Sequence, residues 1–515
     1  MRHFKGGCQV MQWMLEKKEN EKIELLAFLR EQLTADISVK TVGEALGWSK
    51  YLTITVAHQL AEDLMTIYDD EEEPLLSVQQ DDKMLHMPMS RHVNTDAVML
   101  VYLRESLYWT FIKEVFFETI TSYEDFAERF LTTVSTTRNI KRYVVKHLAP
   151  LGIGIDDEYR FTGDESAIRV FFYRLALRFF GDREFPYGED LKIQADAGID
   201  RLAAAIMPKS YIRDSKRIAL RFYYTIAALR VRTGHFVDPH NLDNVLRPND
   251  QMDALTQALI QKMVADSLTH DTINEAQAID EARETLFYLY ALNIVGETDW
   301  FGNLTPTLQQ RLTAIVGVIG QYHEQYFNAS MSAASAEKIK RDLFAPVLTF
   351  ELYARDSGHR RRFDLREAYR MYPVLVEMAL NVSREIAPLV KQPVRDAEEL
   401  FFSYLFTAFV AHFEPAVIFP PIKVDIDITY RPALEVILKR MIAGMAEFNI
   451  VFTNRFEDDV DLVISDAMLT DVDSRYRFDW QHLPNVKELE QLRTRLSELK
   501  AQKFATRFKQ LGIAE

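Results

Sequence analysis

Apolar residues recur with a helical period through most of this chain and with a strand period only near its C-terminal end. Between residues 190 and 415 they are spaced i, i+3, i+4 and i+7, with glycines and prolines at the breaks. After the Pro420–Pro421 pair, the segment 422–429 alternates apolar and polar side chains, as a strand with one buried face does. Amphipathic helical patterns over 433–448 and 486–511 flank two short apolar runs, 449–453 and 460–465. We therefore predict a multidomain, mainly α chain that ends in a small α/β domain of order β-α-β-β-α.

The composition predicts a folded protein of a reducing compartment. The chain has 515 residues, 48% of them hydrophobic, which is enough for roughly three to five domains of about 100–200 residues each. Its one cysteine, Cys8, excludes an intrachain disulfide and a cysteine-based zinc site. Residues 1–10 lack a secretory signal, and the apolar stretch Leu400–Phe413 is shorter than the roughly 20 residues of a membrane span. We expect a cytoplasmic protein with no membrane partner, no metal site and no cofactor.

Positive charge is concentrated in one window of an acidic chain. The formal net charge is −15, and such an average surface disfavours the phosphate backbone of nucleic acids. Between Glu128 and Asp156, however, there is no acidic residue, while five positions are basic. This local inversion of sign is the electrostatic pattern typical of a DNA-binding element.

The basic window has the spacing of a helix–turn–helix. Ser122 is predicted to cap a first helix, residues 132–134 to form the turn, and Ser135 to cap a second helix. A hairpin wing is predicted from the segment 152–155, which contains two glycines, and the segment 159–162 that follows it. Candidate DNA contacts lie on the outer face and first turn of the second helix: Ser135, Thr136, Thr137, Arg138, Asn139, Lys141, Arg142 and Lys146.

These residue types suit the contacts that a recognition helix makes in the major groove. Arginine binds guanine and asparagine binds adenine in a bidentate manner, which supplies sequence specificity. Lysine and hydroxyl side chains suit phosphate oxygens, which position the protein without specifying sequence. The alternative is a solvated basic helix face with no ligand.

A second helix–turn–helix pattern covers Ile23–Tyr68. A short helix over Val39–Leu46 is followed by a tight turn and by Ser49, which is placed to cap the next helix. Ala45 is predicted at the crossing point, where a small residue lets two helices approach closely. The candidate DNA contacts of this unit are Ser49, Lys50, Tyr51 and Thr53. Its outer face has only one lysine, so the pattern is a weaker candidate for reading DNA. The alternative role is packing or dimerisation.

The segment Phe161–Arg169, with Gly163, Glu165 and Arg169, and the Phe185–Pro186 ending resemble the Mga/AtxA-type virulence regulators of Gram-positive bacteria. The resemblance implies winged helix–turn–helix domains, helical phosphotransferase-system regulation domains (PRDs) and a C-terminal domain like the EIIB sugar-transport component. The corresponding boundaries are 1–88 and 89–188 for two helix–turn–helix domains, 189–303 and 304–418 for two PRD-like domains, and 419–515 for the EIIB-like domain.

The resemblance also implies regulation by phosphorylation of histidine by the phosphocarrier HPr. At the positions where the family has the acceptor histidines, this chain has Tyr223 and Phe406. The remaining candidates for a regulatory phosphohistidine are His235, His412 and His323. The loop 429–432, where an EIIB domain has its phosphocysteine, has no cysteine. We therefore expect a structural or dimerisation domain there.

The resulting expectation is a DNA-binding transcription regulator of virulence or sugar-linked genes, usually an activator in this family. Its expected partners are double-stranded DNA, a second copy of the chain, HPr and RNA polymerase. Two alternatives remain: an RNA-binding antiterminator, since those proteins also carry tandem PRDs, and a helical enzyme. The sequence lacks Walker, dinucleotide-binding, zincin and nucleophile-elbow motifs, so we expect no catalytic residues.

Overall fold

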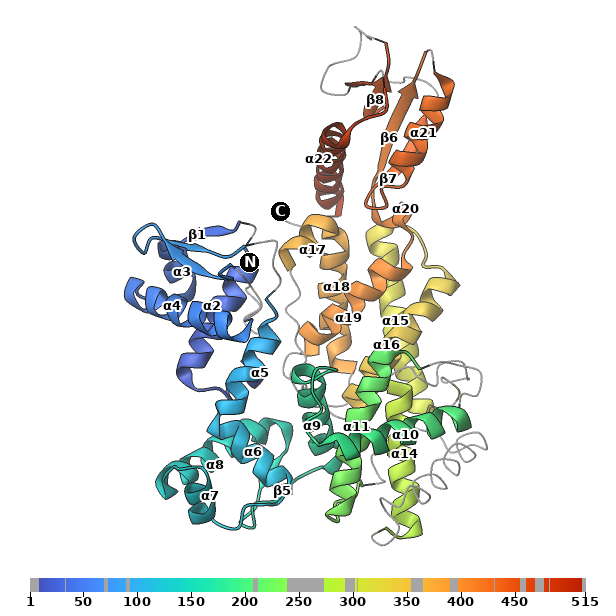
Figure 1. The fold of residues 1–515 in the computed structure, drawn as a ribbon. Helices are drawn as coiled ribbons and strands as arrows, with labels where there is room; N and C mark the ends of the chain where they lie inside the picture. The colour runs from blue at the N-terminus through green and yellow to red at the C-terminus, as the bar shows by residue number, and fades with distance from the viewer. Residues whose placement is uncertain are drawn as a thin grey trace. The chain divides into compact units, whose positions relative to one another are not determined.

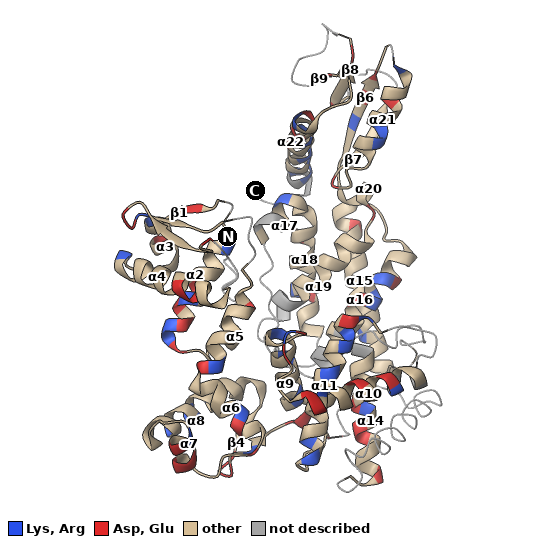
Figure 2. Cartoon of the chain, in the orientation of Figure 1, with Lys and Arg blue, Asp and Glu red and all other residues tan. Residues whose placement is uncertain are grey.

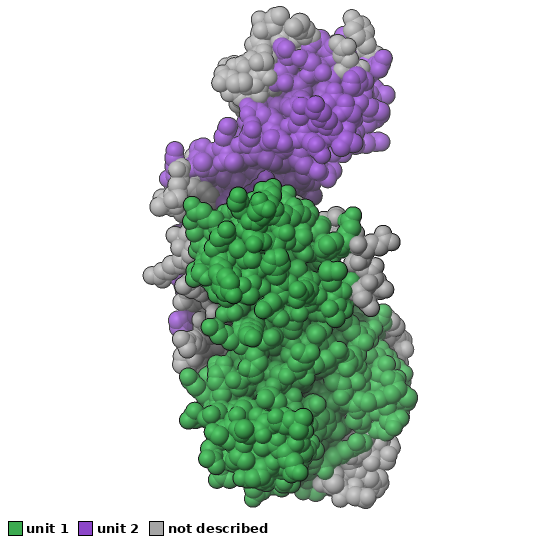
Figure 3. All heavy atoms as spheres, turned by 60° about the vertical axis from the view of Figure 1, so that its left-hand side comes forward, with its two compact units in different colours: residues 1–306, 348–363 green, residues 307–347, 364–515 purple. Residues whose placement is uncertain are grey.

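The computed structural model is mainly helical and divides into two compact units (Figures 1 and 3). Unit 1 contains residues 1–306 and 348–363, and unit 2 contains residues 307–347 and 364–515. The structure describes residues 9–32, 34–68, 73–88, 93–206, 212–238, 273–291, 302, 304–352, 365–389, 397–429, 431–453, 460–467, 477–480 and 482–511. Cys8 and the acidic residues 69–72 lie outside these described ranges.

The N-terminal part of unit 1 is a small helical group with a three-stranded antiparallel sheet. Its elements are α1 (Gln9–Gln12), α2 (Lys17–Arg30), β1 (Asp36–Ser38), α3 (Val39–Leu46), α4 (Lys50–Ile67), β2 (Ser77–Gln79) and β3 (Met84–His86). The strand order is β1-β3-β2. Buried Ile23, Leu26, Val56 and Leu60 join α2 to α4. Helix, strand, two helices and a hairpin in this order form a winged helix–turn–helix.

The turn between α3 and α4 depends on two glycines. Gly47 ends α3 in the left-handed region, with φ of 73°, where a side chain would be strained. A Cβ at Gly43 would lie 3.0 Å from the carbonyl oxygen of Trp48. Gly43 is therefore the small residue at the close approach. The expectation for Ala45 was wrong, because its side chain is exposed.

The next part of unit 1 contains a second helix–turn–helix with a hairpin. Its elements are α5 (Thr95–Glu105), α6 (Leu107–Phe116), α7 (Tyr123–Arg129), α8 (Val134–Leu148), η1 (Ala149–Leu151), β4 (Gly154–Ile155), β5 (Phe161–Thr162) and α9 (Glu165–Phe179). Strands β4 and β5 pair antiparallel, as expected for a wing. Gly163, with φ of 124°, turns the chain from β5 into α9. Its Cβ would collide with the carbonyl of Gly152, so only glycine fits this position.

The rest of unit 1 contains three further helices in the described ranges. They are α10 (Glu189–Ile206), α11 (Asp214–Arg232) and α14 (Glu275–Ala291). Helix α11 contacts both α9 and α10. Tyr223 of α11 is buried and stacks on Tyr288 of α14, with ring centroids 3.7 Å apart. Phe185 stacks on Phe222 at 5.5 Å, so the Phe-Pro segment noted in the sequence is part of this apolar core.

Unit 2 begins with a helical group. Its elements are α15 (Pro306–Phe327), α16 (Ala333–Leu352), α17 (Leu365–Met371), α18 (Pro373–Ile386), η2 (Ala387–Leu389), α19 (Ala397–His412) and α20 (Pro415–Ile418). The first residue of α15 and residues 348–352 of α16 are assigned to unit 1. Helices α18 and α19 pack closely together. The apolar stretch at 400–413 is a core helix, as predicted, with Phe401, Phe406 and Phe409 all buried.

The C-terminal part of unit 2 is an α/β layer with a four-stranded parallel sheet. Its elements are β6 (Pro421–Asp427), α21 (Pro432–Ala443), β7 (Asn449–Thr453), β8 (Leu462–Ser465), β9 (Arg477–Asp479) and α22 (Val486–Leu511). The strand order is β7-β6-β8-β9. Strand β9 was not predicted, because its three residues, Arg477–Asp479, are too few to show an alternation of apolar and polar side chains. Helix α21 ends at Ala443, five residues before the predicted end.

Central strand β6 corrects the prediction of one exposed face. Asp425 was expected to face solvent, but it is buried together with its neighbours Val424 and Ile426. A strand between two parallel neighbours is covered on both faces, which explains the difference. Burial raises the pKa of the Asp425 carboxyl, and the adjacent charge of Asp427 raises it further.

Candidate nucleic-acid interface

The cap of helix α8 lies two residues before its predicted position. The cap is Thr133, whose hydroxyl accepts a hydrogen bond from the backbone N–H of Thr136 at 3.1 Å. Ser135 was predicted to be this cap, and that prediction was wrong, because Ser135 already lies in the first turn of the helix. The predicted cap of α7 is confirmed, since the Ser122 hydroxyl accepts from the N–H of Asp125 at 3.0 Å.

One exposed stripe runs along α8 and carries most of the predicted contact residues. Ser135, Arg138, Asn139, Arg142 and Lys146 are all exposed, and their spacing of three or four residues places them on one helix face. Arg142 Nη2 donates to Asn139 Oδ1 at 3.0 Å. The Arg138 guanidinium lies 5.3 Å from the centroid of the ring of Tyr123, which was not predicted to belong to this site. These contacts orient two arginines and one asparagine on a single face.

Two predicted contact residues of α8 face the core, so their expected exposure was wrong. Thr137 is buried, and its hydroxyl donates to the carbonyl of Thr133 at 3.1 Å. Lys141 is 8% exposed, and its Nζ donates to the carbonyl of Asp156 in the hairpin at 2.6 Å. Lys141 therefore fixes α8 to the wing, with Tyr159 beneath its ammonium at 4.8 Å. Thr136, also predicted, is half-buried and bonds to the Thr133 hydroxyl at 2.8 Å.

The wing between β4 and β5 has an acidic tip. The Asp156 carboxylate accepts the N–H groups of Glu158 and Arg160 and so closes the turn. Asp157 is fully exposed, and Glu158 is largely exposed. Acidic side chains also gather on α7, which is largely red in Figure 2. Because negative charge repels phosphate, the wing tip and α7 are unsuited to contact with a nucleic-acid backbone.

Helix α4 has the same local construction as α8 but few charges. The Ser49 hydroxyl caps it, as predicted, by accepting from the N–H of Leu52 at 3.2 Å. Lys50 is exposed, and Tyr51 is 81% exposed. Thr53 was expected to face outward and does not: it is fully buried, with its hydroxyl donating to the carbonyl of Ser49 at 3.0 Å. In Figure 2 this helix is almost entirely tan.

The three candidate histidines lie in different environments. His323 is buried between Phe327 and Phe413, with its Nδ1 2.7 Å from the carbonyl of Ala329. Burial lowers the pKa of His323, although its hydrogen bond to Ala329 opposes the shift. His412 pairs with the Asp342 carboxylate at 2.6 Å, and His235 Nε2 contacts the Glu118 carboxylate. A core position does not suit transfer from a phosphocarrier protein, so we do not propose His323 as an acceptor.

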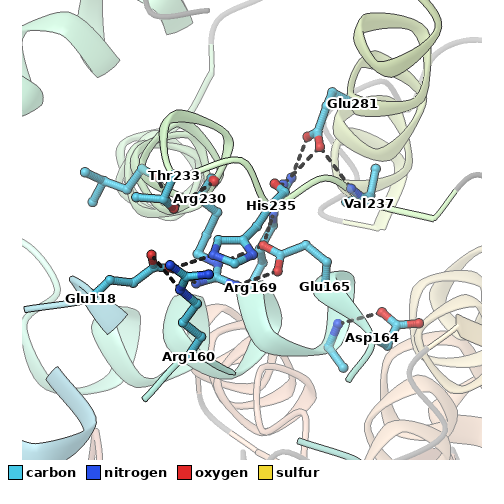
Figure 4. Close-up of polar contacts among 12 residues, drawn as sticks. Glu118, Arg160, Asp164, Glu165, Arg169, Arg230, Thr233, His235, Val237 and Glu281 are labelled. Atoms are coloured by element: carbon cyan, nitrogen blue, oxygen red, sulfur yellow. Dashed lines mark hydrogen bonds and ion pairs between the residues drawn. The ribbon is translucent and has the colours of Figure 1, made fainter. Parts of the chain in front are cut away.

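A buried ion network ties the helix–turn–helix part to the helices that follow it (Figure 4). Arg169 of α9 is fully buried and donates to both oxygens of Glu281, at 2.5 and 2.9 Å. Arg230 of α11 is also buried and donates twice to Glu165, at 2.9 and 2.8 Å. Glu165 and Arg169 stand out in the sequence, but their partners do not, because Glu281 lies 112 residues from Arg169.

The charges in this network compensate one another. Burial by itself raises the pKa of Glu165, but hydrogen bonds from Arg230 and the charge of Arg169 outweigh it and lower that pKa. The carboxylate of Glu281 likewise raises the pKa of Arg169 against the effect of burial. The ion pairs thus favour the charged forms of Glu165 and Arg169 in spite of their burial, and removing a partner would leave a buried charge unpaired.

Other kinds of site are not evident among the described residues. No group of three or more His, Cys, Asp or Glu side chains there is placed to hold a metal ion. None of the helices in the described ranges is both long enough and apolar enough to cross a bilayer.

Comparison with known proteins identifies the second helix–turn–helix. Residues 92–176 match the family model of the Mga helix–turn–helix domain, which runs from the start of α5 into α9 and includes the α8 stripe. The resemblance predicted from the sequence is thus confirmed for this segment. The match supports a DNA-binding transcription regulator, and the family is not one of enzymes. No curated protein matches the chain.

Proposed function

We propose that this chain, whose residues 92–176 form a Mga helix–turn–helix domain, reads double-stranded DNA with helix α8. The observation that carries the proposal is the exposed stripe of Ser135, Arg138, Asn139, Arg142 and Lys146. It is the face that a recognition helix presents to the major groove. Arg138 and Asn139 lie near the N-terminus of α8 and are the base-contacting pair, while Lys146 at the other end neutralises a phosphate.

The first winged helix–turn–helix has a supporting role in this proposal. Ser49, Lys50 and Tyr51 at the start of α4 contact the DNA backbone beside the site read by α8. Trp13, which precedes α2, stacks on His147 of α8 with ring centroids 4.9 Å apart and planes within 5°. That contact supports a fixed spacing between the two helix–turn–helix domains on one duplex.

The regulatory part of the proposal follows from the family resemblance. We propose that the helical segments 189–303 and 304–418 are PRD-like, and that 419–515 is an EIIB-like domain without phosphocysteine. We also propose that the protein is a homodimeric activator of virulence or sugar-linked genes that works with RNA polymerase. His235 and His412 are the proposed acceptors of a phosphoryl group from HPr. Each pairs with a carboxylate that a phosphoryl group would repel.

Selection of DNA from a randomised pool tests the reader assignment. The full-length protein is used to enrich duplexes, and binding of the selected duplex is then measured by fluorescence anisotropy over a salt series. We expect enrichment of a defined motif, with affinity that falls steeply as salt rises because counterions are released. The same sequence as RNA serves as the control. No enrichment and no duplex binding at low salt would overturn the proposal, and preference for the RNA would support the antiterminator alternative.

A further inference from the structure

Three basic groups from three parts of unit 1 converge on the carboxylate of Glu118 (Figure 4). His235 Nε2 contacts its Oε1, Arg160 Nε lies 3.7 Å from its Oε2, and Arg230 Nη1 lies 3.9 Å from its Oε1. His235 follows α11, Arg160 closes the wing, and Glu118 follows α6. Glu118 has a left-handed φ of 54°, a conformation that residues other than glycine rarely adopt.

The guanidinium of Arg230 is incompletely satisfied at this point. Arg230 is 1% exposed, and its Nε and Nη2 are bonded to Glu165. Its Nη1 is buried and has no hydrogen-bond partner. Glu118 is within ion-pair range of this nitrogen but too distant to accept its hydrogen. A buried donor of this kind is costly to leave unpaired, so the cluster lacks an acceptor that the carboxylate of Glu118 does not supply.

The geometry suits a tetrahedral oxyanion. A carboxylate offers two oxygens in one plane, whereas phosphate offers several oxygens pointing in different directions. The three donors come from the hairpin, the end of α11 and the segment after it, and they converge from different sides. This arrangement matches the oxygens of a phosphate better than the two coplanar oxygens of a carboxylate. The site is also open to solvent, because the side chains of Glu118 and His235 are 19% and 23% exposed.

We propose that Arg160, Arg230 and His235 form a binding site for a small phosphate-type oxyanion, which the carboxylate of Glu118 fills from within when no ligand is bound. The ligand is inorganic phosphate or the phosphate group of a small metabolite. On binding, the anion takes over the donors, and Glu118 turns toward solvent. Helix α6, which Glu118 follows, packs against α8, and Arg160 belongs to the wing. The site therefore links a phosphorylated ligand to the two elements around the proposed reader helix.

Chemical rescue tests this site in the full-length protein. Glu118→Ala leaves the three donors without their anion, and we expect a lower thermal midpoint that phosphate or sulfate restores, compared with chloride at equal ionic strength. Wild type should gain much less, because Glu118 competes for the same donors. The matched control is Glu184→Ala, which removes a half-exposed carboxylate from Arg104 elsewhere in unit 1 and should show no such rescue.

Direct binding by isothermal titration separates the possible ligands. We expect at least about a tenfold tighter phosphate affinity for Glu118→Ala than for wild type, and a loss of that gain in Glu118→Ala/Arg160→Ala. Arg160 is half-exposed, so Arg160→Ala also tests the site in an otherwise native protein if the first variant does not fold.

A sugar phosphate that binds tenfold more tightly than phosphate would identify a metabolite site, and equal affinities would identify a phosphate site. If folded Glu118→Ala gains nothing from phosphate beyond the chloride control, the proposal is overturned. The measurement involves no DNA and so stands apart from the assignment of α8.

Discussion

Helices α4 and α8 start in the same way and differ in what they expose. Each begins after a hydroxyl cap, Ser49 or Thr133, that accepts a backbone N–H three residues later. Four residues after the cap, each has a buried threonine, Thr53 or Thr137, that donates to the carbonyl of the cap residue. The two helix–turn–helix units therefore share a local construction.

The exposed faces of the two helices have different chemistry. Helix α8 contains four basic residues, Arg138, Lys141, Arg142 and Lys146, and no acidic one, and three of the four are exposed. Helix α4 has Lys50 near its start and the acidic pair Glu62 and Asp63 near its end. Helix–turn–helix geometry alone is thus insufficient to identify a DNA reader. The charge on the exposed face, which sets the phosphate attraction, makes the distinction.

Removal of the base-contacting pair should have the largest effect. The double variant Arg138→Ala/Asn139→Ala should lose about 1–3 kcal/mol of specific binding for each base contact, or roughly 5- to 150-fold in affinity. Both side chains are exposed, so stability should change little. Anisotropy with the selected duplex measures the loss, and circular dichroism checks the fold.

The matched control is Lys50→Ala/Tyr51→Ala at the corresponding turn of α4. We expect the affinity for the selected duplex to fall by less than about threefold. In our proposal these side chains contact the DNA backbone and make no base contacts, so no sequence-specific binding is lost. A greater loss from the α4 pair than from the α8 pair would transfer the reader role to the first unit.

Lys146→Ala should have a smaller, sequence-independent effect. Loss of one phosphate contact lowers affinity about equally for selected and unrelated duplexes and reduces the salt slope by about 1. The control is Lys40→Ala on α3, whose side chain is 85% exposed and which is not assigned to the interface. A change in sequence preference on Lys146→Ala would show that this residue contacts bases instead.

The smallest expected effect is a pH dependence at the far end of α8. Burial lowers the pKa of His147, and the charge of Lys146 adds to this shift. The histidine binds its proton less readily in the folded chain, so its stabilising contribution is complete above the unfolded pKa and declines as pH falls below about 6.5. Thermal unfolding should show this loss between about pH 7.5 and 5.5.

His147→Phe should reduce that pH dependence while keeping the ring stacked on Trp13. Helix α4 has no stacked histidine at its corresponding end. The comparison of the two helix–turn–helix domains therefore predicts that this pH dependence arises in α8. An unchanged pH profile in His147→Phe would place its origin elsewhere in the chain.

The period of apolar residues and the turn residues sufficed to predict several local features. The helix–turn–helix at 122–148, its wing and the core helix at 397–412 all follow the sequence pattern. The charge inversion between Glu128 and Asp156 was also visible there, because it depends on composition within one window. Such features come from neighbours in the chain, whose relative positions are set by the helical or strand period.

Long-range contacts decided the rest. The sequence could not tell that Lys141 is buried and bonds to the wing carbonyl of Asp156, because a lysine on a basic helix has the same local pattern whether it is exposed or buried. Nor could it place Asp425 inside the sheet, since this depends on strands that are added on both sides of β6.

The sequence by itself therefore determined that the chain is mainly helical, that it carries a basic helix–turn–helix, and which family that unit resembles. Tertiary structure decided which side chains of α8 are exposed and which are buried by packing. It also brought Glu118, Arg160, Arg230 and His235 together from four segments of the chain. The physical reason is that local patterns fix the direction of a side chain on its element, whereas burial and ion pairing depend on what the fold packs against that element.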